Sequence, residues 1–234
     1  MLESAKPLTL ALLLALLPPW ATSASAQGDS GPDVRVDVGI LTGFASGASL
    51  QLFGSVRDFS DQLPVEVRLR LGYTRNDPGD PARARRIFIN NATNGTPEES
   101  GRVLDVDLDV LVASDAVPGE SAYLYAGLRH GRFLANFRFI GGNEDFDVTT
   151  AEWGLGAGAE SRFSLGSRTS LVITAGLDYF FPGRLTGHDT SYGPEGDDVN
   201  PRESFDYDDA DDAVNQPGLR PVLLVGVRRS LGGG

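Results

Sequence analysis

Residues 102–114, RVLDVDLDVLVAS, alternate between apolar and acidic side chains. The even positions from 104 to 110 carry Leu or Val, and the odd positions between them carry Asp105, Asp107 and Asp109. Successive side chains of a β-strand point to opposite faces. The segment is therefore predicted to be a strand with one apolar face and one carboxylate face. The face that points inward decides which class of fold the chain adopts.

Residues 1–26 have the pattern of a cleaved secretory signal peptide. Lys6 precedes an apolar run at residues 8–17, and an Ala-Ser-Ala cleavage site ends at Ala26. The run is shorter than the roughly 20 apolar residues that a membrane-spanning helix needs. We therefore expect an exported mature protein in which residues 27–33 form a short N-terminal segment.

The charge and cysteine content of the mature protein exclude several classes of partner. The whole chain has 32 acidic and 20 basic residues, and loss of Glu3 and Lys6 with the signal leaves 31 acidic residues and 19 arginines, still a net charge of −12. Such an acidic balance argues against nucleic acid and anionic lipid surfaces as partners. The chain has no cysteine, which excludes a disulfide framework.

Apolar and polar residues alternate with period two in eight segments after the signal, whereas no helical period of useful length is found. An all-β protein with eight antiparallel strands is expected. The predicted strands are residues 34–44, 49–57, 65–74, 102–113, 121–138, 149–164, 168–181 and 218–231.

The connections between these strands differ in length in an ordered way. The second, fourth and sixth connections are short, whereas the third (75–101) and the seventh (182–217) are long. Short turns at one end and long loops at the other are typical of outer-membrane barrels, whose turns are periplasmic. Residues 85–95, RRIFINNATNG, either extend neighbouring strands into a hairpin above the membrane or form a separate strand, which would make ten strands possible. We favour the extension.

The same alternation fits a transmembrane barrel, with the apolar face outward, and a soluble barrel, with the apolar face inward. The composition of the polar faces distinguishes the two. Between Glu152 and Glu160 the polar face carries three glycines. Glycine in a strand packs nothing and costs entropy, so a water-facing row of glycines has little rationale. In a lumen of eight strands, which side chains must fill, small residues make room for large ones opposite. We therefore expect the apolar face to point outward.

With the apolar face outward, eight acids and six arginines point into the lumen. Strands 65–74 and 102–113 are adjacent, so that Arg68 and Arg70 face the three aspartates across one ladder. Arginine holds carboxylates in a bidentate way that lysine cannot. The predicted lumen charges are Arg35, Asp37, Glu66, Arg68, Arg70, Asp105, Asp107, Asp109, Arg129, Glu152, Glu160, Asp178, Arg220 and Arg228.

Residues 150–181, TAEWGLGAGAESRFSLGSRTSLVITAGLDYFF, and residues 219–231, LRPVLLVGVRRSL, resemble the small outer-membrane β-barrel family. That family includes the transmembrane domain of OmpA and the OmpX-like barrels of the porin family. The resemblance covers residues 34–231, but its motifs are architectural and not specific to one function. It implies insertion by the barrel-assembly machinery, with outer-membrane lipid and lipopolysaccharide around the barrel.

Candidate sites outside the lumen give weaker signals. The last long loop carries the acidic surface cluster Asp206, Asp208, Asp209, Asp211 and Asp212. A twelve-residue calcium loop counted from Asp206 would place an aspartate where glycine is required, so we expect a solvated loop, with loose calcium binding as the weaker alternative. His130 and His188 have no serine and acid arranged beside them for catalysis.

The sequence therefore predicts an integral outer-membrane barrel of structural or surface-interaction type. Its lumen is expected to be closed by an arginine–carboxylate network that leaves at most a narrow channel, and its loops could bind an extracellular partner. We expect no enzyme activity, cofactor or resident metal. A lipid-modifying outer-membrane enzyme and a soluble periplasmic ligand-binding barrel are the alternatives.

Overall fold

The protein was analysed as a computed structural model, which describes residues 34–60, 62–89 and 95–231. The expected signal peptide (1–26) and the short segment at 27–33 lie outside the described residues.

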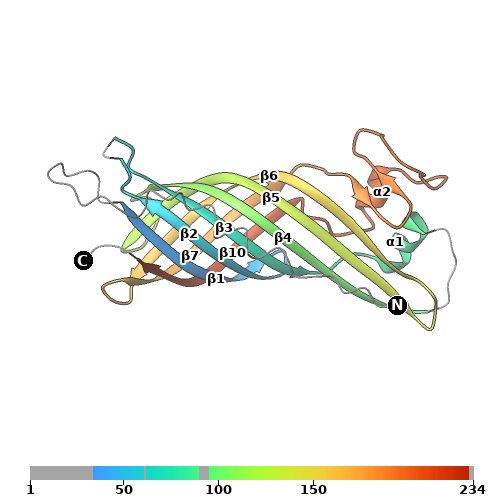
Figure 1. The fold of residues 1–234 in the computed structure, drawn as a ribbon, viewed down its shortest axis with the longest axis horizontal. Coiled ribbons are helices and arrows are strands. Elements are labelled where there is room, and N and C mark those ends of the chain that lie inside the picture. Colours follow the sequence, from blue (N-terminus) through green and yellow to red (C-terminus); the bar gives the residue numbers. More distant parts are fainter. Residues whose placement is uncertain (1–33, 61, 90–94, 232–234) are drawn as a thin grey trace, which may run out of the picture. The chain divides into compact units, whose positions relative to one another are not determined.

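Eight long antiparallel strands form a closed barrel (Figure 1). Each strand pairs with its neighbours in the sheet order β5-β4-β3-β2-β1-β10-β7-β6, and pairing of β5 with β6 closes the cylinder. The predicted fold class, an all-β barrel of eight antiparallel strands, is confirmed. The barrel strands are β1 (Arg35–Ala45), β2 (Ala48–Arg57), β3 (Val65–Asn76), β4 (Thr96–Ala113), β5 (Ser121–Ile140), β6 (Asp145–Ser164), β7 (Thr169–Phe180) and β10 (Leu219–Ser230).

The two long loops carry short elements of their own: α1 (Pro81–Phe88) between β3 and β4, and β8 (Leu185–Thr186), β9 (Ser191–Tyr192) and α2 (Tyr207–Asp211) between β7 and β10. We call residues 77–89 and 181–218 together the cap. Within the described residues, no helix is long and apolar enough to cross a membrane.

The prediction that residues 85–95 extend the strands was wrong for the part that the structure describes. Asp80 caps a helix there, accepting hydrogen bonds from the backbone N–H groups of Ala82 and Arg83, and Pro81 starts the first turn. Ile87 and Phe88 are fully buried at the end of this helix. Their apolar run therefore reflects burial in the cap rather than the alternation of a strand.

Strands β4, β5 and β6 are 18, 20 and 20 residues long, whereas the other barrel strands have 10 to 12. β3 ends at Asn76, opposite Gly101, so the earlier residues of β4 pair only with β5. β4 thus begins at Thr96, six residues before the predicted start at 102. The three strands continue past the barrel because the cap gives them a second core, which contains Ala84, Ile87, Phe88, Val103, Phe133, Ala135, Phe137, Phe139, Phe146, Val148, Leu185, Tyr192, Ala210, Ala213 and Val214.

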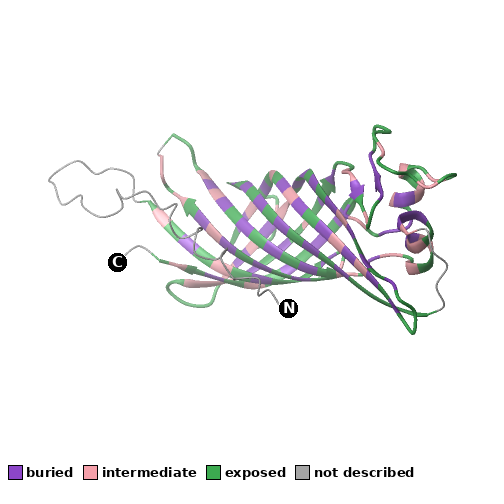
Figure 2. Ribbon diagram, turned by 45° about the vertical axis from the view of Figure 1, so that its right-hand side comes forward, coloured by how far each residue is buried: buried purple, intermediate pink, exposed green. Residues whose placement is uncertain are grey.

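Burial alternates residue by residue along the barrel strands (Figure 2). On β4, the three aspartates at positions 105, 107 and 109 are at most 3% exposed, whereas Leu104 and Leu108 are 52% and 46% exposed. The carboxylate face of the opening segment therefore points into the barrel, and its apolar face points outward.

Candidate functional site

The ladder between β3 and β4 places two arginines opposite two aspartates. Arg68 is the register partner of Asp109, and Arg70 is the partner of Asp107. Nη2 of Arg68 lies 3.2 Å from Oδ2 of Asp109, and Nη2 of Arg70 lies 3.1 Å from Oδ2 of Asp107. All four side chains are at most 1% exposed. Neighbouring strands thus neutralise each other's buried charge.

These pairs belong to a continuous chain of ion pairs, which we call the lumen network. It runs from Arg57 at the turn end of the barrel to Asp105 near the loop end, and it contains seven arginines and seven carboxylates. Its members are Arg57, Asp37, Arg228, Glu66, Arg162, Glu160, Arg68, Asp109, Arg70, Asp107, Arg129, Asp178, Arg220 and Asp105.

Asp109 has three ion-pair partners in this network, as Arg129 also does. Its carboxylate lies within 3.2 Å of Arg68, 3.1 Å of Arg70 and 2.7 Å of Arg129. Burying a charge costs several kcal/mol unless partners and hydrogen bonds compensate for the lost water. Asp109 receives this compensation from three cations on two strands, so it joins β3, β4 and β5 through one side chain.

At the turn end, Arg162 binds Glu66 in a bidentate way, with Nη1 and Nη2 donating to the two carboxylate oxygens at 2.8 and 2.9 Å. Its Nε donates to Glu160 at 2.6 Å. Its guanidinium also lies over the ring of Tyr123, 4.0 Å from the ring centre. Planar stacking and a two-pronged bond are both available to arginine and not to lysine, and the only lysine of the sequence is Lys6.

The glycines of β6 and β7 provide space for the large lumen side chains. A Cβ atom on Gly156 would overlap Asp178 and Arg129, and a Cβ atom on Gly158 or Gly176 would overlap the hydroxyl of Tyr125. Tyr125 in turn lies beside Arg68, with the guanidinium 5.4 Å from the ring centre. The small residues on these strands therefore have large partners opposite them.

The cap closes over the loop end of the barrel through α1 and α2. Arg83 of α1 donates to Asp209 at 3.2 Å and to Asp212 at 3.4 Å. Asp206 caps α2 and forms a capping box with Asp209. Asp206 and Asp209 thus stabilise the local helix, and Asp209 and Asp212 stabilise its contact with α1.

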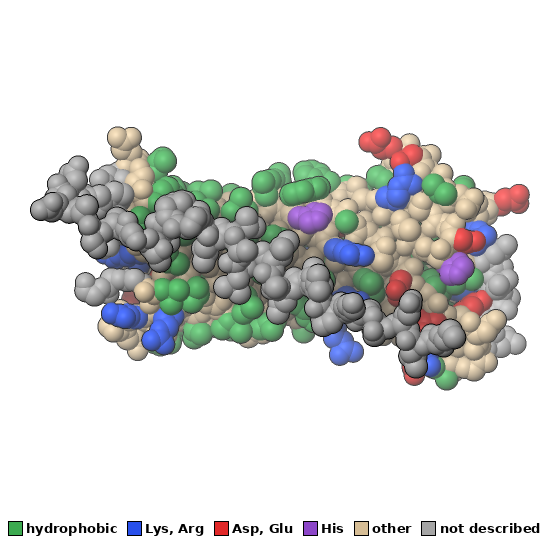
Figure 3. All heavy atoms as spheres, in the orientation of Figure 1, with side chains coloured by type: hydrophobic (Ala, Val, Ile, Leu, Met, Phe, Trp, Pro, Cys, Tyr) green, Lys and Arg blue, Asp and Glu red, His purple; other side chains and the backbone are tan. Residues whose placement is uncertain are grey.

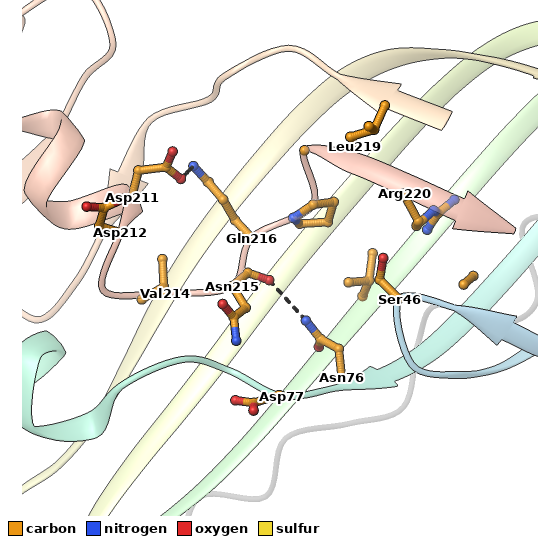
Figure 4. Close-up of a pocket in the computed structure, with 14 residues that line it drawn as sticks. Ser46, Asn76, Asp77, Asp211, Asp212, Val214, Asn215, Gln216, Leu219 and Arg220 are labelled. Carbon is orange, nitrogen blue, oxygen red and sulfur yellow. Dashed lines mark hydrogen bonds between the residues drawn. The ribbon is translucent and has the colours of Figure 1, made fainter. Parts of the chain in front are cut away.

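A cavity of about 460 Å³ lies at the mouth of the barrel beneath α2 (Figure 4). Asn76 donates to the carbonyl of Asn215 at 3.1 Å across this cavity. Gln216 donates to the Tyr207 hydroxyl at 3.0 Å and also to Asp211. Arg220, a member of the lumen network, lines the same cavity. Amide and carboxylate groups therefore separate the lumen from the cap.

The comparisons with known proteins identify the fold. No family model matches the sequence, and no curated protein matches it significantly. A major outer membrane protein of Thermus thermophilus superposes with a TM-score of 0.69 at 22% identity, covering 85% of this chain and 99% of the other. This chain has the fold of a small outer-membrane β-barrel.

Two further structures align with the barrel at lower similarity. The attachment invasion locus protein Ail of Yersinia pestis has a TM-score of 0.45 at 12% identity, covering 86% of this chain and 99% of its own. Neisserial surface protein A has a TM-score of 0.35 at 14% identity, with coverages of 87% and 99%.

The barrel brings together twelve of the fourteen predicted lumen charges. Arg35 lies instead at the turn end, where its side chain is 44% exposed and forms an ion pair with Asp58 at 3.6 Å. Glu152 points into the barrel and is 3% exposed, but it forms no ion pair among the described residues. The two positions differ because Arg35 is the first residue of its strand, whereas the charged neighbour of Glu152 is Asp211 of the cap rather than an arginine.

Two members of the network, Arg57 and Arg162, were missing from the predicted set. Arg162 is an even number of residues from Glu152 and Glu160 on β6, so it shares their face, and the alternation alone would have assigned it to the lumen. Arg57 ends β2 on an inward-facing position, and Nε lies 3.2 Å from Asp37. Strand alternation was a sufficient signal for both residues.

The two histidines of the sequence, His130 and His188, are not members of the lumen network. His130 is on the outward face of β5 and stacks with Trp153 of β6 at 4.7 Å between ring centres. His188 lies in the cap, 3.8 Å from Asp189. In the part of the chain that the structure describes, no three His, Cys, Asp or Glu side chains are arranged to hold a metal ion.

Burial in the cap changes the ionisation of two groups that line or border the mouth cavity. Loss of water around Asp211 raises the pKa of its carboxyl, against the hydrogen bond from Gln216, and Asp212 and Asp208 add to the rise. Burial likewise raises the pKa of Tyr207 to about 12. A raised carboxyl pKa means that the folded cap holds the proton more tightly than the unfolded chain does.

We expect Asp211→Asn to stabilise the cap at neutral pH. For a raised pKa, the penalty is absent below the ordinary aspartate pKa of about 3.9, grows as pH rises from there to the raised value, and is complete above it. Hydrogen exchange of the Ala213 and Val214 amides should therefore be slower in Asp211→Asn than in the wild type at pH 7. The two proteins should converge near pH 4. A difference that is the same at both pH values would contradict this assignment.

Proposed function

We propose that this protein is an integral outer-membrane β-barrel of structural or surface-interaction type, whose lumen is closed to general diffusion by the lumen network. The observation that carries the proposal is the polarity of the wall: charge is inside and hydrocarbon is outside. The side chains that would face lipid are half-exposed, and they include Val38, Ile40, Leu50, Leu52, Leu69, Leu71, Leu104, Val106, Leu108, Val110, Leu124, Leu128, Leu155, Leu177, Leu223, Val225 and Val227.

The extent of this apolar band fits a bilayer. On β4 it runs from Leu104 to Val112, nine residues, and a tilted transmembrane strand needs roughly 9–11. In Figure 3, hydrophobic side chains gather over the barrel wall, whereas acidic side chains lie mainly toward the cap. Soluble monomers rarely expose an apolar patch larger than a few hundred Å². A continuous apolar band around the barrel wall therefore supports the proposal that lipid surrounds the barrel.

Polarity inverts within single strands at the level of His130 and Trp153. Below this level on β5, Leu124 and Leu128 face outward; above it, Arg132 and Arg138 face outward and Phe133, Phe137 and Phe139 are buried inward. A strand that leaves the hydrocarbon must solvate its outer face and acquire an apolar core of its own, which the cap supplies. We place the external membrane boundary at this inversion.

The lumen network supports the proposal that the barrel is closed. Seven arginines and seven carboxylates occupy its length, and an eight-stranded barrel is only wide enough to be filled by side chains. The expected cleaved signal peptide supports export, and insertion would use the barrel-assembly machinery. Surface interactions would use the cap and the hairpin of β5 and β6.

The two alternative functions have less support. A soluble ligand-binding barrel needs an apolar lumen, whereas the apolar side chains of this wall point outward. A lipid-modifying enzyme would need a nucleophile and an acid beside a histidine, but His130 contacts Trp153 and lines a groove that contains threonines and arginines.

Membrane fractionation combined with gel mobility tests the proposed location. We expect the protein in the outer-membrane fraction, with an unheated sample migrating differently from a boiled one because the folded barrel resists detergent. Recovery in the soluble periplasmic fraction, without heat-dependent mobility, would support the ligand-binding alternative. Lipid A mass spectrometry on a His130→Ala strain tests the enzyme alternative, and we expect an unchanged lipid profile.

Planar-bilayer recording tests closure of the lumen. Because the network fills the barrel, we expect the folded wild-type protein to give at most small, flickering currents. Steady openings in the nanosiemens range would overturn the proposal of a closed lumen while leaving the membrane location intact.

A further inference from the structure

Three arginines lie on the outward wall at the proposed external membrane boundary: Arg75 on β3, Arg102 on β4 and Arg132 on β5. We call them the rim arginines. All three are exposed. Arg75 is directly opposite Arg102, and Arg132 is diagonal to Arg102 because its own partner is Leu104, two positions along β4. Directly opposite side chains have Cβ atoms roughly 4.5–5.5 Å apart, and diagonal ones roughly 7–8 Å apart.

The rim arginines have no carboxylate partner among the described residues. The arginines of the lumen network are paired, and so are Arg83, Arg184 and Arg202 in the cap. The outward carboxylates of the strand extension lie farther from the membrane, where Glu98 and Asp145 are both opposite Arg138. Like charges directly opposite each other destabilise a sheet, and no ion pair among the described residues offsets the Arg75–Arg102 pair.

A groove of about 520 Å³ on the outward wall is lined by one of the rim arginines, Arg132. Arg132 and His130 line it from β5, Thr149 from β6, and Thr186 and Arg184 from the cap. Arg184 is already bound to Asp197. Guanidinium and hydroxyl groups are the donors that phosphate oxygens accept, and arginine can bind phosphate with two parallel N–H bonds.

We propose that the rim arginines and this groove bind the phosphate groups of an outer-leaflet membrane lipid. The inference rests on the proposed function, because the apolar band must face lipid. Leu104 lies next to Arg102 on the outward face of β4, and Leu128 lies four residues below Arg132 on β5. A lipid whose acyl chains pack on these side chains therefore brings its phosphate to the guanidinium groups.

The position of the patch selects a lipid over other anions. The chain as a whole is acidic, with a net charge of −12, which argues against general attraction of anionic surfaces. The rim arginines are a local exception to this charge, and they border directly on hydrocarbon-facing residues. A soluble acidic partner would meet the cap before it reached the rim arginines, and the carboxylates that predominate there would repel it.

The only tryptophan after the expected signal peptide, Trp153, supplies the probe. It is 61% exposed and stacks with His130, next to the groove. We would fold the mature protein into phosphatidylcholine vesicles that contain a minor fraction of phosphatidate with brominated acyl chains, and measure quenching of Trp153. The reference is brominated phosphatidylcholine at the same fraction. We expect enrichment of phosphatidate near Trp153 of at least about fivefold, the effect of one arginine near an anionic headgroup.

The variant Arg75→Gln/Arg102→Gln/Arg132→Gln should reduce this enrichment to about that of phosphatidylcholine. Arg138→Gln is the matched control, because it removes an exposed outward arginine of the same strand that faces Glu98 and Asp145; enrichment should persist. Arg102→Gln alone provides a milder variant if the triple variant inserts poorly. Equal quenching by the two lipids, or unchanged selectivity in the folded triple variant, would overturn the proposal.

Two further measurements separate the sources of failure. Inorganic phosphate in the buffer should leave the phosphatidate enrichment largely intact. Complete loss of the enrichment at millimolar phosphate would show that the rim arginines bind a soluble anion instead. Failure of the wild-type protein to insert, judged by heat-dependent gel mobility, would contradict the proposed function itself. Insertion without lipid selectivity would contradict only the lipid site.

Discussion

Asp109→Ala is expected to lower the free energy of unfolding of the barrel by about 3–5 kcal/mol. The carboxylate of Asp109 lies between Arg68, Arg70 and Arg129. Removing it leaves seven arginines against six carboxylates in a lumen that side chains fill, so one positive charge has no compensating carboxylate. Breaking a buried ion pair by deleting one partner costs more than the pair contributes, because the remaining charge is uncompensated.

Denaturant titration of the protein folded in vesicles, followed by Trp153 fluorescence, measures this loss. Asp115→Ala is the matched control, since Asp115 follows the same strand in an exposed turn and should change stability by less than about 0.5 kcal/mol. If Asp109→Ala and Asp115→Ala unfold at the same denaturant concentration, the lumen network does not stabilise the barrel.

Gly176→Ala is expected to destabilise the barrel by about 1–3 kcal/mol, the usual cost of forcing a side chain into a filled interior. The added Cβ would overlap the hydroxyl of Tyr125 and lie 2.7 Å from the carbonyl oxygen of Ala157. The Tyr125 hydroxyl has no hydrogen-bond partner among the described residues. Tyr125→Phe should therefore cost little and should create room for the alanine.

A double-mutant cycle measures this coupling. The cost of Gly176→Ala should fall by at least half in the Tyr125→Phe background, leaving the part that arises from Ala157. Gly166→Ala, in a turn where nothing lies within 4 Å of the added Cβ, serves as the neutral control. Equal costs in the two backgrounds would show that the glycine does not provide space for the tyrosine.

Both experiments test side chains that the alternation of polar and apolar residues had already assigned to the lumen. Period two on β4 fixed which side chains share a face, and the register then placed Arg68 opposite Asp109 and Arg70 opposite Asp107. A slip of one residue would have turned every aspartate of this strand toward the outside. The same alternation also places Arg162 in the lumen, because it lies two residues from Glu160 and on the same face of β6. The prediction omitted this residue.

The cap could not be predicted in this way. Ile87 and Phe88 resemble a strand segment locally, but they end a helix and are buried against residues of the long loop after β7 and of the extended strands. Such contacts join residues about a hundred positions apart, as when the Tyr192 hydroxyl donates to the carbonyl of Ile87. No periodic signal within the loop specifies them.

The sequence by itself determined the eight antiparallel strands and the two faces of each, because side-chain direction in a strand follows from position alone. Only the tertiary structure decided which charges become partners, where the strands leave the proposed membrane region and how the loops fold over the mouth. Those features depend on closure of the barrel, which brings β3 next to β6 across the lumen and sets Arg68 against Glu160. The alternation of residues along one strand does not predict which side chains lie opposite it across the lumen.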